Sequence, residues 1–176
     1  VERADFFTAT GPVMRGKWVD FSHLPDCEDS QSDAALLNSY NQIEAAALAR
    51  YSADHMFSDA HVVHPMQRSI MADLFAAHND RFVSNAGFRF RSTDQFMPQS
   101  LHNHQCIKAG RGRIHAPHDY IHVAANASEQ LTAAQIDGFL DGARHSNIKF
   151  LCINDLPQVE GRFPQARQWI ETAISA

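Results

Sequence analysis

Two short apolar segments near the end of the chain, with a helix-forming stretch between them, constrain the fold most. Residues 120–124 (YIHVA) and 149–153 (KFLCI) have the apolar and β-branched side chains of strands. The stretch 132–143 opens with Thr132, a helix-capping residue, and carries an apolar stripe at helical spacing. A last helix is expected over 164–174. Two successive strand–helix units indicate an α/β fold, with few short strands and flanking helices.

The remaining elements are expected in one domain that spans 1–176. Residues 1–33 contain turn formers and an acidic, serine-rich run without a period, so an irregular lead-in is expected before the helices and strands of 34–176. Periodicity predicts helices at 34–51, 65–77 and 98–109, a short strand at 60–63, and a strand or extended loop at 87–94. No repeat or linker divides the chain.

Composition narrows the class of protein. Fifteen basic against twenty acidic residues give a formal net charge of −5, which argues against nucleic acid as a partner. No apolar run approaches the roughly 18 residues of a membrane span. Three scattered cysteines without a CxxC motif indicate a reducing compartment. The chain opens at Val1 within sequence that already looks structured, so we expect a fragment or the mature end of a longer protein.

Histidine is unusually frequent, with eleven residues, several of them in clusters. His115, His118 and His122 offer the strongest spacing for a metal site. Pro117 argues against the helix that would align all three, and a strand would align only His118 and His122. Because the HExxH pattern is also missing, a zinc site competes with ordinary surface or half-buried histidines.

Two further groups of residues can each be interpreted as a ligand-binding site or as an ordinary structural feature. Arg89 and Arg91, with Arg68, form an anion clamp or a solvated face, because guanidinium groups bind phosphate in a bidentate manner. Asn154 and Asp155 follow the strand 149–153, where ligands of open α/β sheets bind. Asn and Asp are also ordinary turn formers.

The order of several motifs resembles the carboxy-terminal conserved regions of the Stealth family. This family contains bacterial capsular-polysaccharide phosphotransferases and the animal lysosomal-enzyme N-acetylglucosamine-1-phosphotransferase. The similar segments cover nearly the whole chain and are DFF (5–7), ALLNSYN (35–41), HVVHPMQRS (61–69), FRFRS (88–92) with Asp94, and FLCIND (150–155).

Two departures from the family pattern qualify the resemblance. Val63 stands where the family usually has proline. The first two conserved regions are absent, including the Asn-Asp-Asp motif that is expected to bind metal and nucleotide. The resemblance therefore implies about the last half of an enzyme, whose pocket needs the missing N-terminal half.

The resemblance implies transfer of a hexose 1-phosphate, for example N-acetylglucosamine 1-phosphate, from a nucleotide-diphospho-sugar donor to a sugar hydroxyl of a glycan acceptor. The setting would be capsular or exopolysaccharide synthesis, in the cytoplasm or peripherally at the inner membrane. The implied cofactor is Mg²⁺ or Mn²⁺.

The implied catalytic residues are His61, Arg91 and Asp155. His61 would take the acceptor proton or bind a phosphate oxygen. Arg91, with Arg89 or Arg68, would clamp the diphosphate. Asp155, with Asn154, would hold the divalent ion or orient the acceptor, and Asn41 is the recurrent Asn of the family's helix, a further substrate-binding residue.

Two other classes of protein stay open. A non-catalytic module would bind glycan or a partner protein through its arginines, with Asp155 used only in a turn. A small His-rich metal-dependent hydrolase would bring His115, His118 and His122 within about 2 Å of one metal position.

Overall fold

The computed structural model describes residues 2–20, 34–51, 55–115, 119–123, 138 and 147–175. In this part of the chain the fold is mixed α/β, with few short strands and flanking helices, as the sequence predicts. The chain divides into two compact units, and the single domain expected over 1–176 stays a prediction. Unit 1 contains Val1, His61–Val63 and Ala116–Ala176, and unit 2 contains Glu2–Ala60 and His64–His115. The units interleave along the sequence, which explains why no linker separates them.

Unit 2 contains a sheet of three strands in the order β2-β1-β3. The central strand β1 (Val13–Asp20) pairs antiparallel with β2 (His55–Asp59) and parallel with β3 (Arg113–His115). The irregular lead-in expected over 1–33 is therefore wrong at 13–20, and residues 21–33 lie outside the described residues. The strand expected at 60–63 lies instead at 55–59.

Gly16 is the reason that β1 does not look like a strand in the sequence. A Cβ atom at this position would lie 2.3 Å from the Ser58 carbonyl oxygen and 2.8 Å from Cζ of the Phe57 ring. The close approach of β2 thus requires glycine, a residue that is depleted from strands.

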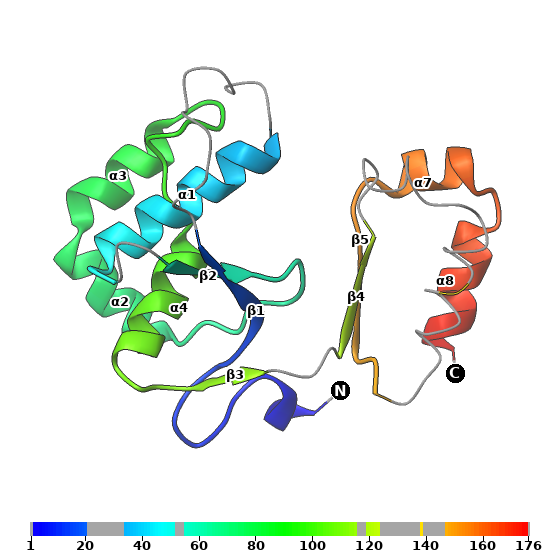
Figure 1. Cartoon of the computed structure of the whole chain (residues 1–176), viewed down its shortest axis with the longest axis horizontal. Coiled ribbons are helices and arrows are strands. Elements are labelled where there is room, and N and C mark those ends of the chain that lie inside the picture. The colour runs from blue at the N-terminus through cyan, green and yellow to red at the C-terminus, as the bar shows by residue number, and fades with distance from the viewer. Residues whose placement is uncertain are drawn as a thin grey trace. The chain divides into compact units, whose positions relative to one another are not determined.

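Four helices gather beside this sheet (Figure 1). They are α1 (Ala34–Leu48), α2 (Arg68–Ala77), α3 (Asn79–Gly87) and α4 (Pro98–Lys108), and a 3₁₀ turn, η1 (Arg3–Asp5), precedes the sheet. The predicted helix at 98–109 is confirmed, and Pro98 occupies its first turn, where proline is favoured. Side chains from both layers form the core, among them Met14, Phe57, Ile70, Leu74 and Leu101.

Unit 1 contains a parallel pair of strands, β4 (Tyr120–Val123) and β5 (Phe150–Ile153). Two helices follow β5 and lie beside the strands in Figure 1, namely α7 (Leu156–Arg162) and α8 (Ala166–Ile174). The predicted strands at 120–124 and 149–153 and the last helix are confirmed. The helix expected over 132–143 lies outside the described residues, apart from the helical Gly138.

Candidate functional site

Two histidines from distant parts of the sequence stack on each other in unit 1. The ring centroids of His61 and His122 are 4.3 Å apart, and the ring planes differ by 2°. His61 is exposed, whereas His122, on β4, is partly buried. The stacking holds the exposed imidazole of His61 in one orientation, with the edge of its ring accessible to a ligand.

The register of β4 and β5 places a polar amide at the same location. His122 pairs with Cys152, and residues paired in this way share one face of the sheet. Asn154 lies two residues beyond Cys152 on this face, and its side chain hydrogen-bonds His122. The Cys152 thiol donates to Oδ1 of Asn154 at 3.6 Å. The structure therefore brings together His61 and Asn154, two predicted site residues, around His122.

The opposite face of the same strands is apolar. Ile121 and Ile153 pack against a small core formed by Val159 of α7, Ala166 of α8, and Phe163 between these helices. The alternation of YIHV and FLCI is thus a division between a core face and a site face.

The electrostatics of the site favour a neutral His122. Burial lowers the pKa of His122, the nearby His61 lowers it further, and the hydrogen bond with Asn154 acts in the opposite direction. Nε2 of His122 is buried and has no hydrogen-bond partner among the residues that the structure describes. Burial also raises the pKa of the Cys152 thiol, so this side chain is a poor nucleophile at neutral pH.

The backbone of Asp155 forms a turn, and a functional role of its carboxylate stays a prediction. Its backbone lies in the left-handed region (φ 56°, ψ 57°), where Asp is among the few non-glycine residues that occur. Its carbonyl oxygen accepts the N–H groups of Gln158 and Val159 at the start of α7. The side chain makes no capping hydrogen bond and is exposed, so the backbone forms the turn while the carboxylate stays accessible.

The stacked histidines are poorly arranged to share one metal ion. An imidazole lone pair lies in the plane of its ring, and two parallel planes do not direct their lone pairs at one point. Among the described residues, no three His, Cys, Asp or Glu side chains are grouped so that they could hold a metal ion. His118 lies outside these residues, so the site of His115, His118 and His122 stays a prediction.

The arginines singled out in the sequence belong to unit 2 and occupy two different places. Arg89 and Arg91 are exposed in the loop between α3 and α4, and Cζ of Arg89 lies 5.3 Å from the centroid of the Phe90 ring. Arg68 is the first residue of α2. Of the two alternatives expected at 87–94, the structure has the loop, over residues 88–94, and Gly87 ends α3.

Asn41 supports the loop that carries these exposed arginines. Its side chain is 3% exposed. Nδ2 donates to the carbonyl oxygens of Ser92 and Gln95 at 2.7 and 2.8 Å. Both amide hydrogens are therefore used inside the protein, and the contact of Asn41 with a substrate stays a prediction.

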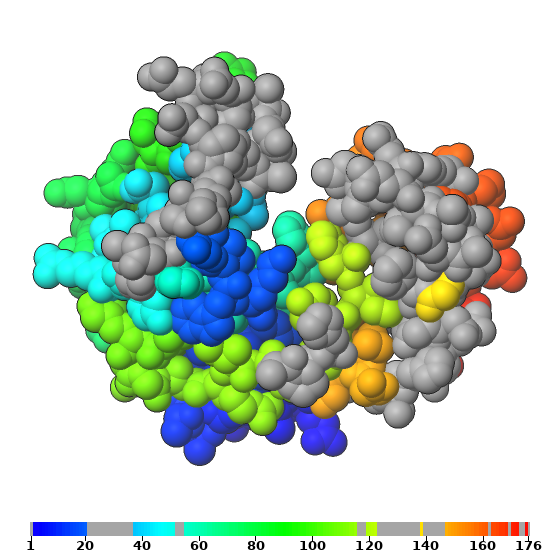
Figure 2. Space-filling view, in the orientation of Figure 1, coloured from blue at the N-terminus to red at the C-terminus, as the bar shows by residue number. Residues whose placement is uncertain are grey.

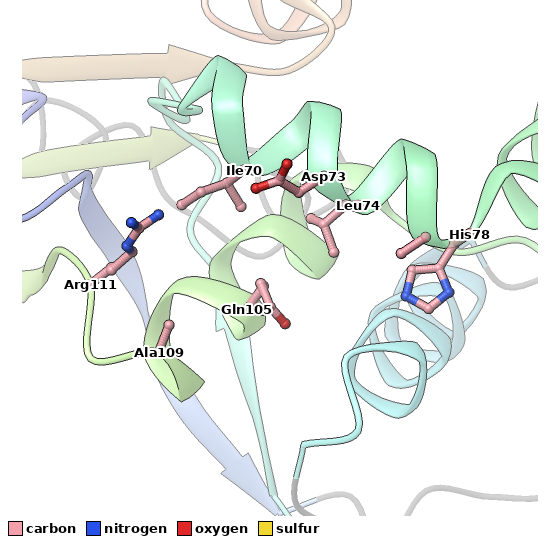
Figure 3. A pocket seen from close by; sticks show the side chains of 8 residues that line it. Ile70, Asp73, Leu74, His78, Gln105, Ala109 and Arg111 are labelled. Carbon is pink, nitrogen blue, oxygen red and sulfur yellow. The ribbon is translucent and has the colours of Figure 1, made fainter.

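Two grooves of about 510 Å³ each mark the surface of unit 2. The first, here called the helix groove, lies between α2 and α4 and is shown in Figure 3. Ile70 and Leu74 form its apolar floor, and Asp73, His78, Gln105 and Arg111 add polar groups. The second, here called the arginine groove, is lined by Arg3, Phe7, Thr8, Ala9, Thr10, Gly11, Met66, Gln67, Arg68 and Arg111.

Two of the eleven histidines are core residues of unit 2. His102 and His104, on α4, are both 0% exposed. Nε2 of His104 accepts the Phe57 N–H at 3.0 Å, and Nε2 of His102 accepts the Gln67 N–H at 2.9 Å. An acceptor nitrogen carries no hydrogen, so the proton of each ring lies on Nδ1. These histidines join α4 to β2 and to the start of α2.

Comparison with known proteins adds no relative. No protein-family model, curated protein or solved structure matches this chain. Within the described residues, no helix has both the length and the apolar character needed to cross a membrane.

Sequence reasoning missed Arg3 and Arg111, and it considered His122 as a metal ligand or as an ordinary surface or half-buried histidine. Arg3 and Arg111 have no motif, and their significance depends on a groove between segments that are distant in the sequence. A signal for His122 was available, because a lone histidine within an apolar strand, two residues after a tyrosine, indicates a face with polar chemistry.

Proposed function

We propose that the chain is part of a sugar-1-phosphate transferase of the Stealth type. It would transfer a hexose 1-phosphate from a nucleotide-diphospho-sugar to a sugar hydroxyl, in capsular or exopolysaccharide synthesis. One observation carries this proposal: His61 of the HVVHPMQRS segment and Asn154 of the FLCIND segment meet at His122. Two motifs that are far apart in the sequence, and that the resemblance assigns to one site, therefore contribute to one cluster.

The reaction needs a base and positioned polar groups. The oxygen of the acceptor hydroxyl attacks phosphorus of the sugar 1-phosphate, the bond to the nucleotide breaks, and a nucleoside monophosphate leaves. His61 would accept the hydroxyl proton or hydrogen-bond a phosphate oxygen, and stacking on His122 fixes its ring for either role. A neutral His122 supports this role because it adds no second positive charge beside His61.

Asp155 would supply only part of the ligand set that a divalent cation needs. The carboxylate of Asp155 is exposed and makes no capping hydrogen bond. Mg²⁺ is ordinarily bound through one or two carboxylates together with substrate phosphates. Asp155 would therefore contribute one ligand, and the missing N-terminal half the others. When bound, Mg²⁺ or Mn²⁺ would neutralise charge on the transferred phosphate.

The arginines of unit 2 would provide the remaining charge stabilisation. Arg91, with Arg89 or Arg68, is expected to clamp the diphosphate, in line with the bidentate binding of phosphate by guanidinium groups. The resemblance implies nucleotide-sugar donors from the cytoplasm. The enzyme would therefore act in the cytoplasm or peripherally at the inner membrane.

The decisive experiment measures release of nucleoside monophosphate from nucleotide sugars with Mg²⁺. The chain is assayed alone and with its N-terminal half supplied, with uridine, guanosine and cytidine donors. His61→Ala should lower turnover by about 100-fold or more, the usual effect of losing a general base. The matched control is His55→Ala, because His55 is also an exposed histidine but lies on β2. If the full-length protein releases no nucleoside monophosphate from any of these donors, the transferase proposal is wrong.

One observation favours a non-catalytic glycan-binding module as a second candidate. Phe90 is 76% exposed in the loop that also carries Arg89 and Arg91. An exposed aromatic ring between two arginines suits binding of an acidic sugar chain. If Phe90→Ala abolishes binding of an acidic glycan while no turnover is found for the wild type, this candidate replaces the transferase.

A further inference from the structure

The arginine groove of unit 2 concentrates positive charge on a chain that is acidic overall. Arg3, Arg68 and Arg111 all line it, and none of its described lining residues is acidic. The formal net charge of the whole chain is −5. The positive charge of these three arginines is therefore opposite in sign to the net charge of the chain.

Among the described residues, no ion pair involves Arg3, Arg68 or Arg111, although Arg111 also lines the helix groove, to which Asp73 belongs. The ion pairs found among these residues join Arg81 to Glu44 and Arg167 to Glu160, and neither involves a residue of the arginine groove. All three groove arginines are exposed. Arginine has five N–H donors, so each of these exposed side chains can offer several donors to a ligand.

The backbone brings the three arginines together from distant parts of the sequence. Gly112 (φ 81°) packs so closely on Pro12 that a Cβ atom would lie 2.4 Å from the Pro12 carbonyl oxygen. That oxygen also accepts the Arg113 N–H at 2.8 Å. This contact holds Arg111 beside the turn formed by residues 8–11. Figure 2 shows the first residues (blue) against the segment around β3 (yellow-green).

Neutral donors complete the groove. Arg68 is the first residue of α2, a helix of ten residues without a side-chain cap. The first N–H groups of a helix have no intrahelical acceptor, and they carry a partial positive charge. The Gln67 N–H is already bound by His102, so the donors that remain begin at Arg68. Thr10 adds an exposed hydroxyl group to the lining, whereas the Thr8 hydroxyl already donates to the Gly11 carbonyl oxygen at 3.0 Å.

We propose that the arginine groove is a binding site for a phosphate group, with Arg3, Arg68 and Arg111 as its ligands. Three guanidinium groups match the three or more charged oxygens of a phosphate monoester or diphosphate better than the two oxygens of a carboxylate. The groove, at about 510 Å³, also has space for a sugar or nucleoside attached to the phosphate. The inference goes beyond the transferase proposal, because it concerns unit 2 and holds whether or not the chain has turnover.

Titration calorimetry of the full 176-residue chain at low ionic strength tests the site. Inorganic phosphate and pyrophosphate are the first probes, and we expect saturable binding, tighter for pyrophosphate. Arg3→Gln, Arg68→Gln and Arg111→Gln should each weaken binding about tenfold or more, as expected for a lost charge-assisted hydrogen bond. Because all three side chains are exposed, circular dichroism should show an unchanged fold.

Arg81→Gln is the matched control. Arg81 is an exposed arginine of the same unit, on α3, outside the groove. This variant removes the same charge and should leave phosphate affinity unchanged. Absence of saturable binding by the wild type would overturn the proposal. Equal weakening by Arg81→Gln would do the same, since it would indicate a general charge effect.

Two further titrations identify the group that is attached to the bound phosphate. Glucose 1-phosphate and uridine monophosphate are titrated in the same way, and the tighter ligand identifies the attached group. Binding without turnover in the presence of the N-terminal half would leave the groove standing and reject the transferase. If the wild type binds no phosphate and Arg111→Gln keeps its turnover, the phosphate site is rejected. The transferase proposal is then unaffected.

Discussion

The imidazole rings of His61 and His122 lie parallel at a centroid distance of 4.3 Å, although the two residues are 61 positions apart (122 − 61). Protonation of one ring disfavours protonation of the other at such a distance. The nearby His61 accordingly lowers the pKa of His122, in addition to the larger effect of burial.

Removal of one ring should be visible in the titration of the other. His61→Ala removes a nearby positive charge and uncovers His122, and both effects raise the pKa of His122 towards 6.5. NMR titration of the His122 ring protons measures this shift. His55→Ala should leave the titration unchanged, and an unaltered His122 pKa in His61→Ala would contradict the stacked arrangement.

Acid should destabilise unit 2 through its buried histidines. Burial lowers the pKa of His102 and His104, against opposing effects of hydrogen bonds and of Asp59. Between the lowered folded pKa and the unfolded value of about 6.5, the unfolded chain binds more protons. The stability is thus complete above about pH 6.5 and falls as the pH drops below it, by up to about 1.4 kcal/mol per pH unit for each histidine.

Urea unfolding between pH 7.5 and 5 measures this loss. His104→Gln keeps an acceptor for the Phe57 N–H but does not titrate, so its stability should depend less on pH. His55→Gln, at an exposed position, should retain the wild-type slope. A wild-type slope in His104→Gln would show that His104 is not the titrating group.

Substitutions at Asp155 should separate the roles of its backbone and its carboxylate. Asp155→Val places a β-branched residue at φ 56° and should cost about 1–2 kcal/mol. Asp155→Asn and Asp155→Gly tolerate the left-handed region and should unfold near the wild-type denaturant midpoint. If the carboxylate holds the cation, both stable variants lose release of nucleoside monophosphate. Full turnover by Asp155→Asn would reduce Asp155 to a turn former.

Asn41 should be essential for the stability of unit 2. Asn41→Asp replaces two donated hydrogen bonds with a carboxylate that faces the carbonyl oxygens of Ser92 and Gln95. We expect a loss of about 3 kcal/mol or more in free energy of unfolding, because buried acceptors would be left without donors. Asn38→Ala, on the same helix, is the control for urea unfolding and should cost less than 1 kcal/mol, roughly the effect of a surface substitution.

Local patterns predicted some elements well and could not predict others. The helix at 98–109 was predictable because it has a proline at its start and ends before Gly110. Strand β1 was not, because Gly16 is required by the Phe57 ring on another strand. Helix α3 (Asn79–Gly87) was missed because it has few apolar side chains and follows α2 directly, although its apolar residues do keep helical spacing.

The candidate site shows the same division between local and distant information. Motif order pointed to His61 and Asn154, and the structure places both at His122. The roles of His102 and His104 depend on N–H groups of Phe57 and Gln67, which no local spacing encodes. The arginine groove likewise exists only after Gly112 packs on Pro12.

The pairing of β4 with β5 has a consequence for insertions and deletions. The carbonyl oxygen of Asp119 accepts the N–H groups of Lys149 and Phe150, at 2.7 and 3.2 Å, and so sets the register of the two strands. A shift by one residue would turn Cys152 towards the helices and Ile153 towards His61. The length of the chain just before Phe150 is therefore as strictly constrained as any side chain of the site, even though none of its residues would contact a substrate.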